Sequence, residues 1–197
     1  MAIDTQIATR ISIEEYHTMI VDGLLESGDR TELLDGQIVT TMGHNPPHAD
    51  AITCLLLFGM RVLANLPEWL MRFQLPITLD GSEPQPDFAI VSGSKNRYRR
   101  RHPGPSEIAL VVEVADSSSG QDQDRKQMIY ARAGLPIYWI VNIQDACVEV
   151  YTQPIQEPTP HYNRVERFRI GDRLPLMLAG IEVGQIDLND FFIEIEE

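Results

Sequence analysis

The chain has 197 residues, of which 43% are hydrophobic and 23% charged, a composition typical of a soluble globular protein. The net charge of -13 counts against a uniformly basic nucleic-acid-binding surface, because Lys and Arg supply most of the affinity for phosphates. No apolar run reaches the roughly eighteen residues of a membrane span, so we expect no transmembrane helix.

Two further features indicate the compartment. The N-terminus lacks a basic segment followed by an apolar stretch, so we expect no secretory signal. Cys54 and Cys147 lie in apolar runs without metal-ligand spacing, which is typical of buried thiols in a reducing compartment. We therefore expect a cytoplasmic protein.

The first half of the chain predicts a helix, a hairpin and a second helix. Residues 12–21 have a helix-capping start and end near a glycine. In residues 32–40, the Asp35-Gly36 pair favours the two-residue turn of a β-hairpin. Apolar residues return every three or four positions over residues 47–66, which predicts a helix that Pro67 ends.

The second half alternates strands with one helix. The range 107–114 is the clearest buried strand, since it is almost wholly aliphatic. Beyond Pro154 we expect only short, irregular β segments. The remaining predictions are strands at 73–79, 87–91, 136–142 and 147–152, a turn at 116–120 and a helix at 122–133. This order predicts an α/β fold with a mixed central β-sheet flanked by helices.

Glu113 is the one acid in the interior of the buried strand, within residues 108–114. Desolvating an unpaired carboxylate costs several kcal/mol, so Glu113 needs a proton, a cation or a strong partner. Three structural roles compete with a catalytic one: facing solvent, pairing with an arginine, or lying in water at the strand end. A second acid favours catalysis, because Asp87 opens a neighbouring strand, and two like charges attract a divalent cation.

Lys126 completes a set with chemical meaning. It lies thirteen positions after Glu113 and, if its helix starts near Asp122, about one turn into that helix. Phosphodiester cleavage needs a metal that polarises the phosphate and a cation near the developing charge. The competing interpretation is a surface lysine that pairs with Asp122.

Four motifs follow one another in the chain, at residues 30–36, 86–91, 110–114 and 122–141. In this order they resemble the Uma-type family of restriction endonucleases, which belongs to the PD-(D/E)xK nuclease superfamily. The resemblance extends over about residues 11–152. It implies a restriction-endonuclease-like fold, and we expect residues 1–197 to form one nuclease-like domain with an irregular β-rich extension at 153–197.

The resemblance also implies roles for individual residues. Asp87 and Glu113 correspond to the two metal-binding acids, Glu32 to an upstream acid that supports the metal or its water, and Lys126 to the catalytic lysine. One position departs from the superfamily pattern: Ala115 stands two residues after Glu113, where a lysine is usual. The resembling family carries its lysine on the next helix, as Lys126 does here.

These residues lead to a functional hypothesis. We expect a Mg²⁺- or Mn²⁺-dependent endonuclease that acts on DNA, and a homodimer, since many such nucleases address two strands. Two alternatives stay open. One is a catalytically inactive interaction module that keeps the fold, favoured by the acidic balance and Ala115; the other is a metal-dependent hydrolase of RNA or of smaller phosphodiesters.

Other residues are candidates for substrate binding. His48 stands at a helix start and is a substrate contact or a cap, and Gln85 precedes the Pro86-Asp87 pair. A basic segment places five of the sixteen basic residues within seven positions: Lys95, Arg97, Arg99, Arg100 and Arg101. Such a run marks either a solvated loop or a phosphate-binding surface. Because it connects the strands of Asp87 and Glu113, we expect it near the site.

Overall fold

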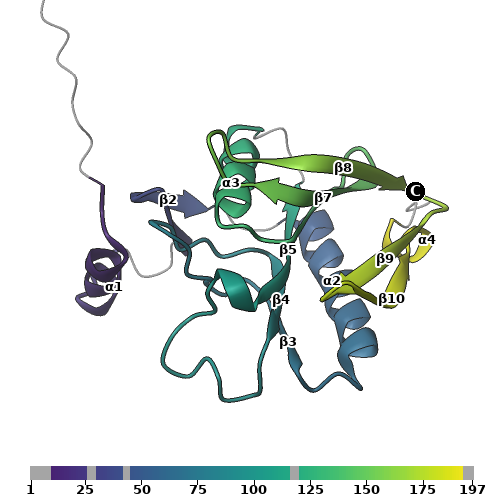
Figure 1. The fold of residues 1–197 in the computed structure, drawn as a ribbon, viewed down its shortest axis with the longest axis horizontal. Coiled ribbons are helices and arrows are strands. Elements are labelled where there is room, and N and C mark those ends of the chain that lie inside the picture. Colours follow the sequence, from purple (N-terminus) through teal and green to yellow (C-terminus); the bar gives the residue numbers. More distant parts are fainter. Residues whose placement is uncertain (1–9, 26–29, 42–44, 116–119, 193–197) are drawn as a thin grey trace, which may run out of the picture.

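A six-stranded sheet lies at the centre of the protein (Figure 1), whose computed structural model describes residues 10–25, 30–41, 45–115 and 120–192. The spatial order is β3-β4-β5-β6-β7-β8; β5 and β6 run parallel, and the other neighbours are antiparallel. The strands are β3 Trp69–Arg72, β4 Phe88–Ser92, β5 Ile108–Ala115, β6 Ile137–Asn142, β7 Cys147–Ile155 and β8 His161–Arg169. The predicted mixed central sheet is confirmed.

Helices cover both faces of this sheet. α2 (Pro46–Leu63) packs on one face together with the hairpin of β9 (Arg173–Leu178) and β10 (Ile181–Asp187) and the short helix α4 (Leu188–Phe191). α3 (Gly120–Arg132) packs on the opposite face. None of the helices in the described part of the chain is both long and apolar enough to cross a membrane.

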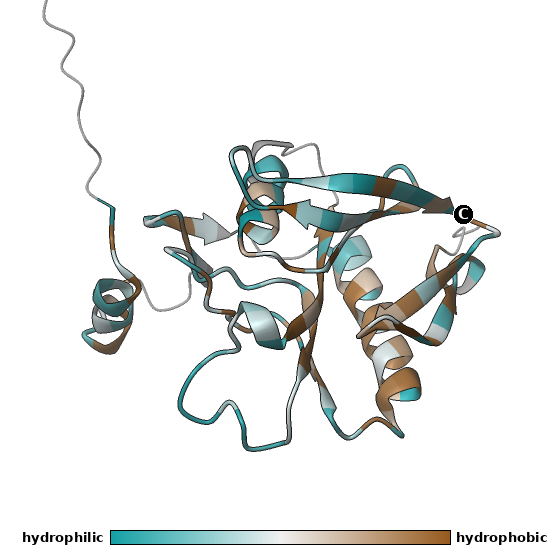
Figure 2. Ribbon diagram, viewed as in Figure 1, coloured by the Kyte–Doolittle hydropathy of each residue, from teal (hydrophilic) through white to brown (hydrophobic). Residues whose placement is uncertain are grey.

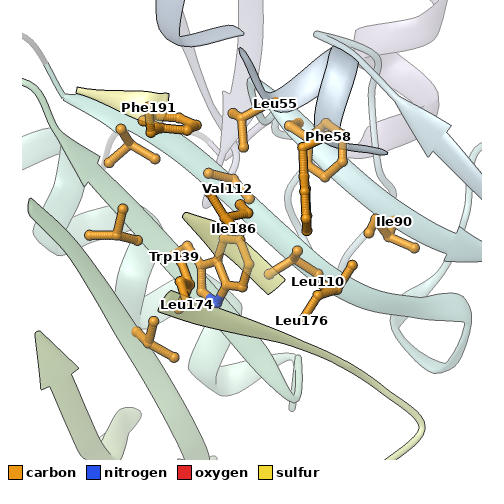
Figure 3. Packing of buried hydrophobic residues seen from close by; sticks show 14 of the residues in the cluster. Leu55, Phe58, Ile90, Leu110, Val112, Trp139, Leu174, Leu176, Ile186 and Phe191 are labelled. Atoms are coloured by element: carbon orange, nitrogen blue, oxygen red, sulfur yellow. The ribbon is translucent and has the colours of Figure 1, made fainter. Parts of the chain in front are cut away.

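The core on the α2 side is broad and apolar. Figure 3 shows Leu55 and Phe58 of α2 gathered with Val112 and Trp139 of the sheet, while Leu176 of β9 closes the cluster from the hairpin side. In Figure 2, hydrophobic colour follows α2 and the strands β4 and β5, whereas the loop between these strands is hydrophilic. The sheet therefore stays fixed between two apolar layers, which makes it a rigid base for polar groups at its ends.

A helix and a hairpin precede α2 in the chain. α1 (Ile13–Val21) has Ser12 and Glu15 in a reciprocal capping box, and its Tyr16 hydroxyl donates to the Thr31 carbonyl at 2.7 Å. β1 (Arg30–Leu34) and β2 (Gln37–Thr41) pair through the predicted turn, where Asp35 and Gly36 have φ of 48° and 72°. The hairpin prediction is confirmed.

Alternation along β5 places its one acid on the α3 face of the sheet. Val112 packs in the core against α2, whereas Val111 packs on the α3 side. Because successive side chains of a strand point to opposite faces, Glu113 faces α3. Phe88 of β4 lies opposite Val112, and the antiparallel register therefore sets Asp87 opposite Glu113.

One predicted strand is wrong. Residues 73–79 form no strand, and β3 lies earlier, at Trp69–Arg72. Gln74 has a φ of 50°, which breaks an extended run, and Pro76 has no N–H to donate to a ladder. The apolar alternation has another cause: Ile77 and Leu79 are buried under the α3 face as part of a loop.

The expectation of irregular structure beyond Pro154 is also wrong. β8 is a nine-residue strand of the central sheet, and β9 and β10 form a regular hairpin that joins the main core. β8 lies at the sheet edge and carries mostly exposed polar residues, so its sequence shows no apolar alternation. The other predicted elements begin and end within three residues of the observed ones. In the predicted turn at 116–120, residues 116–119 lie outside the described part.

Candidate active site

Four charged side chains meet at the end of the sheet where β4 begins and β5 ends. Lys126 of α3 lies between two acids, with its Nζ 3.0 Å from Glu32 Oε2 and 3.1 Å from Glu113 Oε1. Asp87 lies opposite Glu113. All three carboxylates are buried, with 2% of Glu32, 7% of Asp87 and 8% of Glu113 exposed. We call these four residues the acidic site; each of them was named from the sequence.

Asp87 is held in its ionised form. The Val114 N–H donates to Asp87 Oδ2 at 2.9 Å, and His48 Nε2 lies 3.3 Å from the same oxygen. Burial by itself raises the pKa of Asp87, but the hydrogen bond and charge of His48, together with the Val114 N–H, lower it below its ordinary value. His48, a candidate from the sequence, therefore contacts a member of the acidic site.

Glu113 has the opposite electrostatic balance. Burial raises its pKa to about 7; the charge of Lys126 opposes this rise, and the charges of Asp87 and Glu32 add to it. Its Oε1 also accepts a 2.6 Å hydrogen bond from the Tyr130 hydroxyl. Glu113 is thus a carboxylate whose negative charge is only partly compensated by the protein.

Lys126 reaches the site from further along its helix than expected. α3 begins at Gly120, so Lys126 lies about 9 Å along the helix axis rather than one turn from its start. Burial lowers the pKa of Lys126, but the nearby charges of Glu113 and Glu32 raise it above its ordinary value, so the side chain stays an ammonium. With every group ionised, three carboxylates face one ammonium.

Gln85 contributes to the site through its backbone. Its N–H donates to Glu32 Oε1 at 3.0 Å, while its side-chain amide donates to the Thr31 carbonyl at 2.8 Å. The side chain therefore fixes the loop against β1. The backbone of Gln85 thus positions Glu32. Its side chain already has a partner in the Thr31 carbonyl, so no substrate contact is needed to explain it.

The basic segment does not lie where the sequence predicted. Val91, near the end of β4, pairs with Ile108, at the start of β5, so the loop between them is at the sheet end opposite the acidic site. Glu113 lies five positions after Ile108, a distance of about 16 Å at 3.3 Å per residue. Figure 1 shows this loop extending away from α3. An antiparallel hairpin puts its loop far from the start of its first strand, and Asp87 stands at that start.

Part of the basic segment has a structural partner. Arg97 Nε and Arg101 Nη2 each lie 2.7 Å from Glu107 Oε1, and the Arg101 guanidinium stacks over the Tyr98 ring at 5.6 Å. Lys95, Arg99 and Arg100 are exposed. Two of the five basic residues therefore serve an ion-pair network in the loop.

Tyr130 is a site residue that sequence reasoning missed. It is fully buried, and its hydroxyl binds Glu113. A signal was present, since Tyr130 follows Lys126 by four positions on a predicted helix, and residues four apart share a helix face. The face that carries the lysine toward Glu113 carries the tyrosine there too.

The mixed sheet with helices on both faces, and with acids at the adjoining ends of β4 and β5, is a restriction-endonuclease-like α/β fold. The sequence matches, over residues 13–188, the Uma2 family described as "Putative restriction endonuclease". The chain belongs to this family, as the motif order indicated.

A solved structure shares the fold. It is described as "a putative nuclease belonging to DUF820" from Anabaena variabilis, and it aligns with a TM-score of 0.68 over 92% of this chain and 97% of the other, at 16% identity. At this identity the likeness establishes the fold alone. No curated protein matches the sequence significantly.

Proposed function

We propose that this protein is a metal-dependent endonuclease that hydrolyses phosphodiester bonds in DNA. The observation that carries the proposal is the acidic site itself, where a single ammonium contacts two buried carboxylates and a third, Asp87, lies opposite one of them. Buried charge without compensation is costly, and proteins place it where a cation or a reaction uses it. Family membership supports the same class of activity.

The donor set fits Mg²⁺ or Mn²⁺. These ions prefer carboxylate oxygens, and Mg²⁺ commonly takes one or two carboxylates and leaves other positions to water and phosphate. Asp87 and Glu113 face each other on paired strands and would hold the ion, because Lys126 already lies between Glu113 and Glu32. A bound ion would supply positive charge to the phosphate and lower the pKa of water.

The remaining side chains have distinct roles in this proposal. Lys126 donates to both Glu32 and Glu113, so its ammonium is fixed beside the reaction centre, where it stabilises negative charge on the phosphate. Glu32, fixed by the Gln85 N–H, orients Lys126 and water. His48 orients Asp87 from the start of α2.

Cleavage of duplex DNA by isosteric variants tests the proposal. The parent protein should cleave in Mg²⁺ or Mn²⁺ and not in a chelator. Asp87→Asn and Glu113→Gln should each lose at least about 100-fold in rate while keeping the parent circular dichroism. Asp145→Asn, in the exposed β6–β7 turn, is the matched control and should cleave like the parent. Equal cleavage by all four proteins would overturn the assignment.

Two further measurements separate the rival functions. Calorimetric titration with Mn²⁺ distinguishes an inactive interaction module, in which Asp87→Asn removes no binding. A panel of single- and double-stranded DNA and RNA distinguishes a ribonuclease, which would leave DNA intact. Sedimentation of the full chain, alone and with DNA, tests the homodimer that cleavage of both strands favours.

A further inference from the structure

A second group of metal-ligand side chains lies outside the acidic site. It consists of His17 of α1, Glu83 of the loop before β4 and His102 of the loop before β5. Each offers one ligand atom, and these atoms lie within 4.8 Å of one another. Among the residues that the structure describes, only this group brings three such atoms so close.

Glu83 is the fixed member of the group. Its side chain is 1% exposed, and its Oε2 accepts a 2.9 Å hydrogen bond from the Thr78 hydroxyl. Its backbone N–H donates to the Leu33 carbonyl at 2.6 Å, which ties the residue to β1. The carboxylate therefore presents its other oxygen, Oε1, from a constrained position.

Both histidines direct a ring nitrogen to that oxygen. His17 Nε2 lies 2.8 Å from Glu83 Oε1, and His102 Nε2 lies 4.0 Å from it. The two rings stand nearly edge to face, with centroids 6.2 Å apart and an interplanar angle of 71°. The side chains of His17 and His102 are 46% and 34% exposed, so an ion can enter from solvent.

The donor chemistry differs from that of the acidic site. Two imidazoles and one carboxylate suit Zn²⁺ and related divalent transition ions, which accept nitrogen ligands, whereas Mg²⁺ prefers oxygen. With bonds of about 2.0–2.1 Å in a tetrahedral site, ligand atoms stand about 3.3 Å apart. The observed 2.8 Å and 4.0 Å distances lie on either side of this value, so small side-chain movements complete the geometry.

We propose that His17, Glu83 and His102 form a binding site for a divalent transition ion of the Zn²⁺ class, which fastens α1 to the loops before β4 and β5. The fourth position faces solvent and takes water. Without an ion, the short contact between His17 and Glu83 already links α1 to the loop before β4, and an ion adds His102 to that link. The proposal is independent of the nuclease function, because it uses none of the residues of the acidic site.

Calorimetric titration of the full, chelator-treated chain with Zn²⁺ tests the proposal. We expect a binding event that weakens at least about 10-fold in His17→Gln and in His102→Gln, separate from any Zn²⁺ bound at the acidic site. His161→Gln, an exposed histidine on β8, and Asp87→Asn, in the acidic site, are the matched controls and should keep this event unchanged. Both ligand variants replace partly exposed side chains, and circular dichroism verifies that they fold.

Co²⁺ gives a second readout. Tetrahedral coordination by nitrogen and oxygen should produce visible absorption in the parent and in His161→Gln, and not in His102→Gln. Zn²⁺ should also raise the melting temperature of the parent and not that of His102→Gln. The proposal is overturned if the parent binds no Zn²⁺, if His17→Gln and His102→Gln bind it like the parent, or if Asp87→Asn removes the binding event.

Discussion

Glu107 directly precedes β5 and Glu113 lies six positions later, near the other end of that strand; both are 8% exposed, yet their surroundings differ in charge. Glu107 accepts hydrogen bonds from Arg97, Arg101 and the Gly104 N–H, and its pKa falls to about 2. Burial raises the pKa of Glu113 to about 7, with one lysine and two further acids beside it. Equal residue exposure thus accompanies opposite shifts of the pKa.

The difference separates a carboxylate with a structural role from the one that we propose to be functional. At Glu107 two arginines face one acid, so the negative charge is fully compensated and the group fixes the loop. At the acidic site three acids face one ammonium, with the imidazole of His48 beside Asp87, so the protein compensates the negative charge only in part. Burial alone therefore does not identify an active site; the count of opposing charges around the buried group does.

The largest expected effect comes from removing the one cation of the acidic site. Lys126→Met leaves Glu32, Asp87 and Glu113 without their ammonium, and we expect the free energy of unfolding in a chelator to fall by about 3 kcal/mol or more. Denaturant unfolding at neutral pH measures it. Glu113→Gln, which removes one acid instead, should leave the stability equal or higher. An unchanged free energy of unfolding in Lys126→Met would contradict the comparison, since it would mean that the three carboxylates do not destabilise one another.

Glu107→Gln tests the other end of the strand. The variant keeps the side-chain shape but loses the charge that Arg97 and Arg101 bind, and we expect the free energy of unfolding at neutral pH to fall by about 2 kcal/mol. The estimate allows for screening, because the two arginine side chains are 48% and 52% exposed. Cleavage of DNA should not change, which distinguishes this glutamate from Glu113.

The contribution of Glu107 should also depend on pH. Hydrogen bonds from Arg101 first, then from Gly104 and Arg97, lower its pKa from 4.5 to about 2 against the effect of burial. The unfolded chain takes up this proton near pH 4.5, so the stabilisation is complete above that value and is lost as the pH falls toward 2. The difference in stability between the parent and Glu107→Gln should shrink accordingly; a difference that is constant from neutral pH to about pH 3 would contradict the assigned pKa.

Much of the fold could be predicted from the residue types within short segments of the sequence. The turn at Asp35-Gly36 and the buried strand β5 follow from residue types that tolerate few alternatives. β8 was not predictable in the same way, because an edge strand with exposed polar residues has no apolar period. The alternation at 73–79 was misleading, since a loop pressed against the core can bury every second residue as a strand does.

The positions of the candidate site residues could be predicted where a motif marks the end of a strand. They could not be predicted where they depend on whether neighbouring strands run parallel or antiparallel. Asp87 and Glu113 could be predicted to lie together because each stands near the end of a strand, in a motif that resembles the family pattern. The basic segment was misplaced, because the loop of an antiparallel pair lies at the end opposite those two acids. The contact of His17 with Glu83 joins positions far apart in the sequence, and no local sequence pattern predicts it.

A smaller effect is expected where a neutral group supports Glu113. Tyr130→Phe removes the 2.6 Å hydrogen bond to Glu113 Oε1, and we expect the affinity for Mn²⁺ and the cleavage rate to fall about 10-fold. Tyr162→Phe is the matched control: it removes a hydroxyl that donates to the Leu135 carbonyl at 3.0 Å on the same face of the sheet. Both variants should lose about 1 kcal/mol of stability, but only Tyr130→Phe should lose metal affinity. Equal metal affinities would place the tyrosine outside the site.

The smallest effect concerns the exposed part of the basic segment, beyond the arginines that Glu107 binds. Arg99 and Arg100 are exposed and lie in the loop at the sheet end opposite Asp87 and Glu113, so we expect them to contact the DNA backbone away from the cleaved bond. Arg99→Gln combined with Arg100→Gln should raise the Kd for duplex DNA about 3-fold and reduce the dependence of log K on log salt by up to about two. Arg173→Gln combined with Arg164→Gln, at side chains 72% and 56% exposed, removes the same two charges elsewhere and controls for net charge. A salt dependence that falls equally in the control would mean that the segment acts only through the charge of the whole protein, and that its arginines serve the loop around Glu107 rather than the substrate.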